Sequence, residues 1–227
     1  MSEATPRGAG TTGIDTSDMK ALHRVFREAL SLAPQLVGGV TAGDKARSAL
    51  VGSYYFNVLR LLHVHHDGED ELLWPKLYER CPERAELVKR AAGQHQDVVA
   101  LVEESCKQTS QWSASAEPAD AEQLQGTIDS LQTVLVAHLD EEEELVLPLC
   151  SQHLSQAEWG QLPQHGMKSF DGDKPWLIMG LIRDQLAPDQ LSGMDAALPP
   201  PVKQMWATFG QSAYNEFMNE LSPPSAP

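Results

Sequence analysis

The chain carries two copies of a histidine followed four residues later by a glutamate, His65 with Glu69 and His138 with Glu142. In both copies a leucine precedes a proline that stands ten residues after the histidine. Residues four apart on an α-helix lie on the same face, so each copy places an imidazole beside a carboxylate. Both groups are ligands of divalent transition metals.

Apolar residues at helical spacing surround both pairs and predict that the pairs face the core. These residues are Val58, Leu61, Leu62, Leu72 and Leu73 in the first copy and Leu131, Val134, Leu135, Leu145 and Val146 in the second. A carboxylate is almost never buried without a partner. The pattern therefore predicts a bound metal ion. The competing interpretation is a set of buried histidines and glutamates that hydrogen-bond only to one another.

Two further histidines, His23 and His95, also lie on apolar helical faces. With His65 and His138 they place one core-facing imidazole on each of four expected helices. Dinuclear iron and manganese sites in helical bundles are built from such inward-facing imidazoles and carboxylates.

The other four of the eight histidines have weaker signals. We place His63 and His66 on the polar face of their helix with Asp70, in contact with solvent. His153 ends a helix as a packing or capping residue. His165 is an additional candidate ligand, in an expected loop from Pro163 to Gly166.

The expected elements are helices separated by Gly- and Pro-rich turns. The first helix begins at Thr16 or Ser17 and ends near Pro34. The second runs from Asp44 to Tyr78 with a kink at Pro75, the third from Glu83 to Lys107, and the fourth from Asp120 to His153. A loop over Ser110–Ala119 separates the third helix from the fourth. The fold class is all-α, an antiparallel up-down four-helix bundle with a C-terminal helical extension packed on it.

We divide the chain into a disordered N-terminus (1–15), the bundle (16–154), the extension (155–221) and a frayed tail (222–227). In the extension we expect a helix over Trp176–Leu186 and an amphipathic helix over Val202–Phe217, with Trp206 and Phe209 buried.

Composition excludes several classes of protein. The formal net charge of −15 argues against nucleic acid and anionic membranes as partners. The three cysteines form no C-x-x-C motif, which fits a reducing compartment. The N-terminus has no signal-peptide pattern and no segment has the length of a membrane span, so we expect a cytoplasmic protein. The oligomeric state stays open.

With these residues assembled, residues 17–153 resemble the hemerythrin-like (HHE cation-binding) family, in its bacterial non-haem diiron branch. The resemblance implies two iron ions bridged by carboxylates and an oxo or hydroxo group, held by His23, His65, Glu69, His95, His138 and Glu142. Manganese and zinc are the alternatives. The chain departs from the oxygen carriers because Val99 stands where they have a second histidine on the third helix, and because the last pair is His-x-x-x-Glu.

Four histidines, two bridging glutamates and an oxo or hydroxo bridge leave about two of about twelve positions open on two octahedral ions. This count favours an oxidoreductase that turns over hydrogen peroxide like a catalase or peroxidase, with nitric oxide as a second substrate. One alternative is a module that binds, stores or senses oxygen, nitric oxide or iron. Another is an oxygenase acting on an organic molecule, with Trp176, Met179, Trp206 and Phe209 of the extension lining its pocket.

Overall fold

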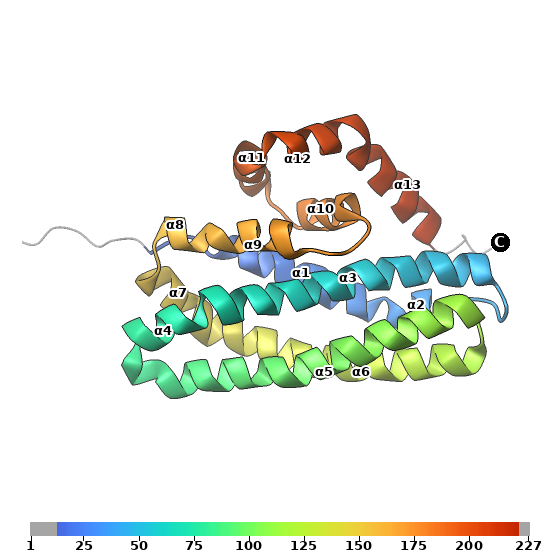
Figure 1. The fold of residues 1–227 in the computed structure, drawn as a ribbon, viewed down its shortest axis with the longest axis horizontal. Helices are drawn as coiled ribbons and strands as arrows, with labels where there is room; N and C mark the ends of the chain where they lie inside the picture. The colour runs from blue at the N-terminus through green and yellow to red at the C-terminus, as the bar shows by residue number, and fades with distance from the viewer. Residues whose placement is uncertain (1–12, 223–227) are drawn as a thin grey trace, which may run out of the picture.

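The computed structural model describes residues 13–222, and within that range every regular element is a helix (Figure 1). The first half comprises α1 (Ser17–Ser31), α2 (Ala33–Leu36), α3 (Lys45–Leu72), α4 (Trp74–Arg80), the 3₁₀ turn η1 (Pro82–Arg84), α5 (Ala85–Ser115), α6 (Pro118–Glu141), the π-helical turn η2 (Glu142–Val146) and α7 (Leu147–His153). The second half comprises α8 (Gln156–Trp159), α9 (Gln161–Ser169), α10 (Pro175–Asp184), α11 (Pro188–Ala197), α12 (Pro200–Met205), the π-helical turn η3 (Trp206–Gly210) and α13 (Gln211–Leu221).

The three longest helices, α3, α5 and α6, run beside one another with α1 along the long axis of the molecule (Figure 1). Helix α5 packs on both α3 and α6, and α1 packs on α3 and α6. Their inward-facing apolar residues form one core, which includes Phe26, Leu30, Val98, Ile128 and Leu131. Burial of this surface is the main stabilising term for such an arrangement.

Helix α3 is buried over an unusually wide arc. Its buried residues include the consecutive pairs Tyr54-Tyr55, Val58-Leu59 and Leu61-Leu62. Neighbours in a helix are about 100° apart, so the burial of both members of successive pairs requires a broad enclosed arc. Helix α3 instead contacts α1, α5, α9 and α10. Two adjacent side chains on α3 can therefore both be enclosed.

The loop expected over Ser110–Ala119 is wrong. Helix α5 continues to Ser115, and the connection to α6 is a short turn in which Ala116 adopts φ 55°. The serines of this stretch bond back to their own helix, since Ser110 Oγ donates to Cys106 O at 3.0 Å and Ser113 Oγ to Thr109 O at 2.6 Å. Polar composition therefore did not mark a loop here, because the hydroxyls are satisfied by helix carbonyls.

The helical geometry changes at both proline motifs. Helix α3 ends at Leu72 and α4 begins at Trp74, close to the kink expected at Pro75. In the second copy the helix continues through the π-helical turn η2, where Leu147 N donates to Glu142 O five residues earlier. A proline has no N–H to give and its ring crowds the preceding turn, which explains a change of helical register just before Pro148.

The extension packs against the long helices through α9 and α10 (Figure 1). Leu177 and Ile178 of α10 enter the main core, together with Tyr214, Phe217 and Leu221 of α13. The expected burial of Phe209 is wrong, since its side chain is 51% exposed. The π-helical turn η3 shifts the register of the amphipathic stripe, so that Tyr214 takes the inward position.

The expected loop around His165 is also wrong, because Gln161–Ser169 forms α9. At the other end of the described range, Ile14 N donates to Ser151 O at 3.0 Å, and Ser151 Oγ donates to Ile14 O at 2.7 Å. Most of the segment expected to be disordered, residues 1–12, and most of the expected frayed tail, residues 223–227, lie outside the described residues. None of the described helices combines the length and apolar character that crossing a membrane requires.

Candidate metal centre

Two groups of buried side chains in the described range have the composition and spacing of metal sites. One consists of His23, His65, Glu69 and Glu142, and the other of His66, Glu69, His95 and His138. Within each group the candidate ligand atoms lie within 4.8 Å of one another. Glu69 belongs to both groups, so the two candidate positions are adjacent and share a carboxylate.

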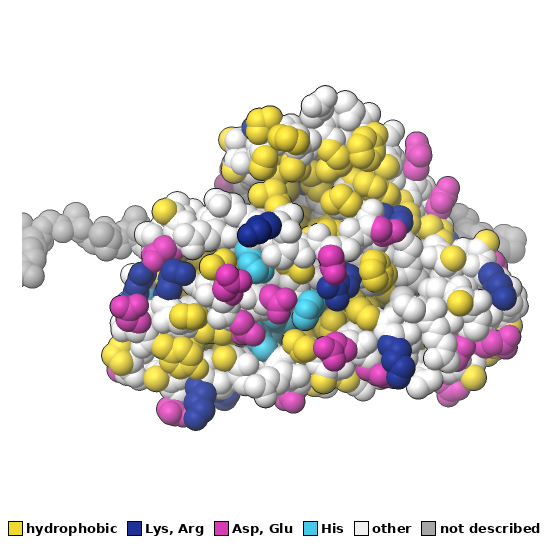
Figure 2. Space-filling view, in the orientation of Figure 1, with side chains coloured by type: hydrophobic (Ala, Val, Ile, Leu, Met, Phe, Trp, Pro, Cys, Tyr) yellow, Lys and Arg dark blue, Asp and Glu magenta, His cyan; other side chains and the backbone are white. Residues whose placement is uncertain are grey.

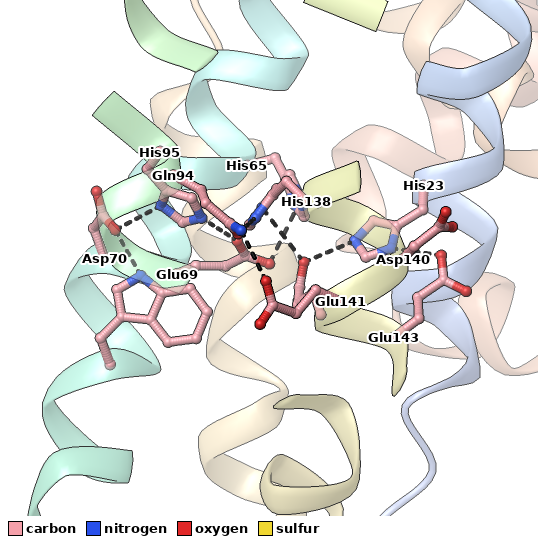
Figure 3. Close-up of polar contacts among 12 residues, drawn as sticks. His23, His65, Glu69, Asp70, Gln94, His95, His138, Asp140, Glu141 and Glu143 are labelled. Carbon is pink, nitrogen blue, oxygen red and sulfur yellow. Dashed lines mark hydrogen bonds and ion pairs between the residues drawn. The ribbon is translucent and has the colours of Figure 1, made fainter. Parts of the chain in front are cut away.

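The seven residues come from five elements, and Figure 3 shows five of them, His23, His65, Glu69, His95 and His138, lying close together. His23 lies on α1, His95 on α5 and His138 on α6, while α3 supplies His65, His66 and Glu69, and η2 begins with Glu142. The structure therefore brings together all six ligands expected from the sequence, and it adds His66.

The two carboxylates lie between histidines of different helices. Glu69 Oε1 is 3.5 Å from His65 Nε2, and Glu69 Oε2 is 3.4 Å from His95 Nε2. Glu142 Oε2 is 3.4 Å from His23 Nε2 and 3.8 Å from His138 Nε2. Glu69 therefore belongs to both groups, and Glu142 Oε2 lies between His23 of the first group and His138 of the second.

The inward-facing polar atoms of the site have no hydrogen-bond partner among the described residues. They are Nε2 of His23, His65, His95 and His138, both ring nitrogens of His66, and both carboxylate oxygens of Glu69 and Glu142. An unsatisfied buried polar group costs about 1–3 kcal/mol, and an unpaired buried charge costs more. A cation between them would coordinate these nitrogens and oxygens, so the residues present fit a bound metal.

On the outer side, three imidazoles are held by hydrogen bonds from Nδ1 (Figure 3). His23 Nδ1 donates to Glu143 Oε1 at 2.9 Å, His95 Nδ1 to Asp70 Oδ1 at 2.7 Å, and His138 Nδ1 to Gln94 Oε1 at 2.9 Å. The acceptors are oxygens, so the proton lies on Nδ1 and the Nε2 lone pair points inward. Such outer partners fix the tautomer and orientation of metal-binding histidines.

The acceptors are themselves anchored. Trp74 Nε1 donates to Asp70 Oδ1 at 2.6 Å, and Gln94 Nε2 donates to Glu141 Oε2 at 2.8 Å. Asp70, placed on the polar face of its helix in the sequence analysis, and Glu143 thus both contact an imidazole of the candidate centre. The role of Gln94 was missed, although it directly precedes His95 in the sequence.

The expectation that His66 faces solvent is wrong. Its side chain is 1% exposed, and its ring centroid lies 4.3 Å from that of His95, 4.9 Å from His65 and 5.2 Å from His138. The cause is the wide buried arc of α3, in which His65-His66 continue the series of consecutive buried pairs. Those pairs are the sequence signal that could have identified it.

The remaining histidines lie outside both groups. His63 is half-buried, with Nε2 3.4 Å from Asp67 Oδ2 on the same helix. His165 Nδ1 lies 3.5 Å from Glu71 Oε2, and its ring covers Gly68, where a Cβ would meet His165 Cδ2 at 3.2 Å. The structure therefore gives His165 a packing position between α9 and α3 and does not bring it to the candidate ligands.

Burial controls the charges of the metal-free site. It raises the pKa of Glu69, and together with the Glu69 carboxylate it raises the pKa of Glu142 well above its usual value. Burial and the neighbouring imidazoles lower the pKa of His65 and His66 well below the usual value. Without a cation the neutral forms of these four groups are thus favoured, and a bound cation reverses this preference for the carboxylates.

The comparisons with known proteins agree with this geometry. A family model described as the hemerythrin HHE cation binding domain matches residues 15–150, which include all seven residues of the two groups. No curated protein and no solved structure gave a match. Because the family model matches more than half of the chain, the protein belongs to the hemerythrin HHE cation-binding family.

Proposed function

We propose that this protein holds a non-haem diiron centre at the two groups and uses it to bind a small ligand such as oxygen or nitric oxide. In this proposal α1, α3, α5 and α6 with α7 form an antiparallel up-down bundle around the iron pair. The observation that carries the proposal is the set of buried, partnerless nitrogens and oxygens that point toward a shared centre.

The fifth histidine changes the expected coordination. Five imidazole nitrogens and four oxygens of two bridging carboxylates make nine protein donors, against about twelve positions on two six-coordinate ions. An oxo or hydroxo bridge would take about two more and leave about one position open. A single open position favours binding of one small ligand over turnover at two adjacent open positions. Iron fits nine nitrogen and oxygen donors better than zinc, which prefers four.

The iron pair, when bound, would supply the redox chemistry that oxygen binding or peroxide reduction requires. The chain supplies orientation and exclusion of water. Asp70, Glu143 and Gln94 hold three imidazoles with Nε2 inward, and the ligand side chains are almost completely buried. Peroxide turnover is the second candidate, because His66 has no outer partner and forms the least constrained part of the site.

The proposal is tested by loading metal-free protein with ferrous iron without oxygen and measuring the iron bound per chain. We expect two ions in the wild type. Glu69→Gln should lose at least one, because a neutral amide is a poor bridge and does not offset the charge of two cations. Glu143→Gln should keep both, since its side chain still accepts the His23 Nδ1 hydrogen bond.

Oxygen, nitric oxide and peroxide are then added separately to the loaded protein, and the absorption spectrum and the consumption of each ligand are followed. Stable binding without consumption would support the binding function, and sustained loss of peroxide would support the second candidate. Wild-type protein that takes up no stoichiometric iron, or equal iron in both glutamate variants, would contradict the proposed centre.

A further inference from the structure

His66 differs from every other imidazole of the candidate centre in how it is held. Nδ1 of His23, His95 and His138 donates to an oxygen. His65 has no such hydrogen bond among the described residues, but its Nε2 lies 3.5 Å from Glu69 Oε1. Neither nitrogen of the buried His66 ring has a hydrogen-bond partner among the described residues.

His66 also stands apart from the carboxylates. His23, His65, His95 and His138 each place Nε2 within 4.0 Å of a glutamate oxygen, at distances of 3.4 to 3.8 Å. Within the described range, His66 makes no contact of this kind. The contacts that define its position are the rings of His65, His95 and His138, at centroid distances of 4.3 to 5.2 Å.

Aromatic packing of this kind allows a ring to rotate more easily than a hydrogen bond from Nδ1 does. Removing the outer partner of a metal-binding histidine typically lowers metal affinity about 10- to 100-fold. His66 lacks such a partner in the native sequence. His65 also lacks an outer partner, but unlike His65, His66 has no carboxylate oxygen within 4.0 Å in the described range. We therefore expect His66 to be the weakest of the five imidazole donors.

A plain core role does not account for His66. A core histidine buried at this depth normally has its nitrogens satisfied by hydrogen bonds. Both of its nitrogens are unsatisfied, next to the equally partnerless Nε2 atoms of His95 and His138. The position indicates a donor that needs a metal and has little else to hold it in place.

Resting on the proposed diiron function, we propose that His66 is the releasable donor of the centre. It occupies one metal position in the resting protein and leaves that position when a small ligand arrives. The other four histidines and the two glutamates hold both ions throughout. The centre then has about one open position while His66 occupies its metal position and about two after His66 has left it.

The probe for this proposal is azide, a small anionic ligand, added to protein loaded with ferric iron. Wild type is compared with His66→Ala, with the more conservative His66→Gln, and with His95→Ala, which removes an anchored imidazole. Metal content is measured by mass spectrometry, azide binding by absorbance, and folding of the metal-free proteins by circular dichroism.

Both His66 variants should keep two ions, with metal affinity reduced less than about tenfold, while His95→Ala should lose at least about a hundredfold. Azide should bind the His66 variants about tenfold more tightly than the wild type, because it no longer competes with the imidazole. Free imidazole added to His66→Ala should restore the weaker azide binding, and it should have no such effect on the wild type.

Loss of metal from both His66 variants to the extent seen in His95→Ala would overturn the proposal, since His66 would then be a fixed ligand. Equal azide affinity in the wild type and the His66 variants would also overturn it, because His66 would not compete for a metal position. Failure of the proposed diiron function would give a different result, namely a wild-type protein that does not take up two ions.

Discussion

In the metal-free site, different neighbours set the charges of the His95 and His138 imidazoles. Burial, followed by the nearby His95 and His23, lowers the pKa of His138 to about 3. Burial also acts to lower the pKa of His95, but its hydrogen bond to Asp70 and the adjacent Glu69 carboxylate outweigh that effect and raise it to about 9. Two histidines whose rings lie 4.8 Å apart therefore favour opposite protonation states.

The low pKa of His138 predicts a loss of stability in acid for the metal-free protein. The unfolded chain takes up a proton near pH 6.5, whereas folded His138 resists it down to about pH 3. Stability from this residue is complete above pH 6.5 and falls as the pH decreases, by roughly 1.4 kcal/mol per unit.

Chemical denaturation of metal-free wild type and His138→Gln between pH 7 and pH 5 measures this effect. The stability of the wild type relative to the variant should decrease by that slope below pH 6.5, because the other titrating groups are common to both proteins. A difference between the two proteins that does not change with pH would show that folded His138 titrates normally.

Residue spacing alone was enough to place six of the seven candidate ligands on inward faces, because each lies in an apolar stripe with a period near 3.6. His66 was missed because that method assumes one buried face per helix. Helix α3 packs on several neighbours, so two directions on it are enclosed. The burial of His66 is indicated by the consecutive apolar pairs that precede it on α3, and not by the histidine itself.

At the scale of elements, the two π-helical turns are where sequence periodicity and structure diverge. Each adds a residue to one turn, so side chains beyond it are rotated relative to a continuous α-helix. Turn η3 leaves Phe209 exposed and directs Tyr214 inward. Turn η2 lets Glu142 face the centre while Val146, Leu147 and Cys150 still pack in the core. A prediction from sequence periodicity assumes a constant α-helical period and therefore does not include such an extra residue.

Deleting Glu144, an exposed residue inside η2, should remove the extra residue of that turn. Closing this turn to an α-helical one would change the direction of Glu142 relative to the following core residues, so either the core or the carboxylate must leave its position. We expect a melting temperature lowered by several degrees and less bound metal. Glu144→Ala is the matched control and should change neither. A deletion variant with unchanged melting temperature and metal content would show that the π-helical turn has no part in placing Glu142.

At the scale of the whole molecule, the extension is joined to the long helices by both core packing and ion pairs. Arg60 forms two hydrogen bonds with Asp171 at 2.6 Å, and Arg47 donates to the carbonyls that end α13. Figure 2 shows hydrophobic side chains gathered on the face of the extension toward the viewer. A cavity of about 220 Å³ there is lined by Met179, Arg183, Asp195, Leu198, Lys203 and Trp206. None of these residues belongs to the metal groups, so this cavity does not support the oxygenase alternative.

The contact between α10 and α13 depends on a missing side chain at Gly180, where a Cβ would meet the Tyr214 ring at 2.2 Å. Gly180→Ala should therefore separate the two helices and lower the melting temperature. Gly193→Ala, in the exposed α11 where a Cβ meets nothing within 4 Å, should leave stability unchanged or raise it by about 0.5–1 kcal/mol through helix propensity.

Limited proteolysis of both variants should show faster cleavage after α10 in Gly180→Ala only. Equal melting temperatures and cleavage rates in the two alanine variants would mean that the extension does not depend on this contact.

The position of Glu69 in both groups has a consequence for how the centre fills. Two ions that share one carboxylate do not bind independently, because the first fixes the orientation and charge of a group that the second also needs. Chains that carry a single ion are then not a statistical mixture of two half-filled sites. Binding of the two ions is thermodynamically linked, so the affinity measured for one ion depends on whether the other is bound.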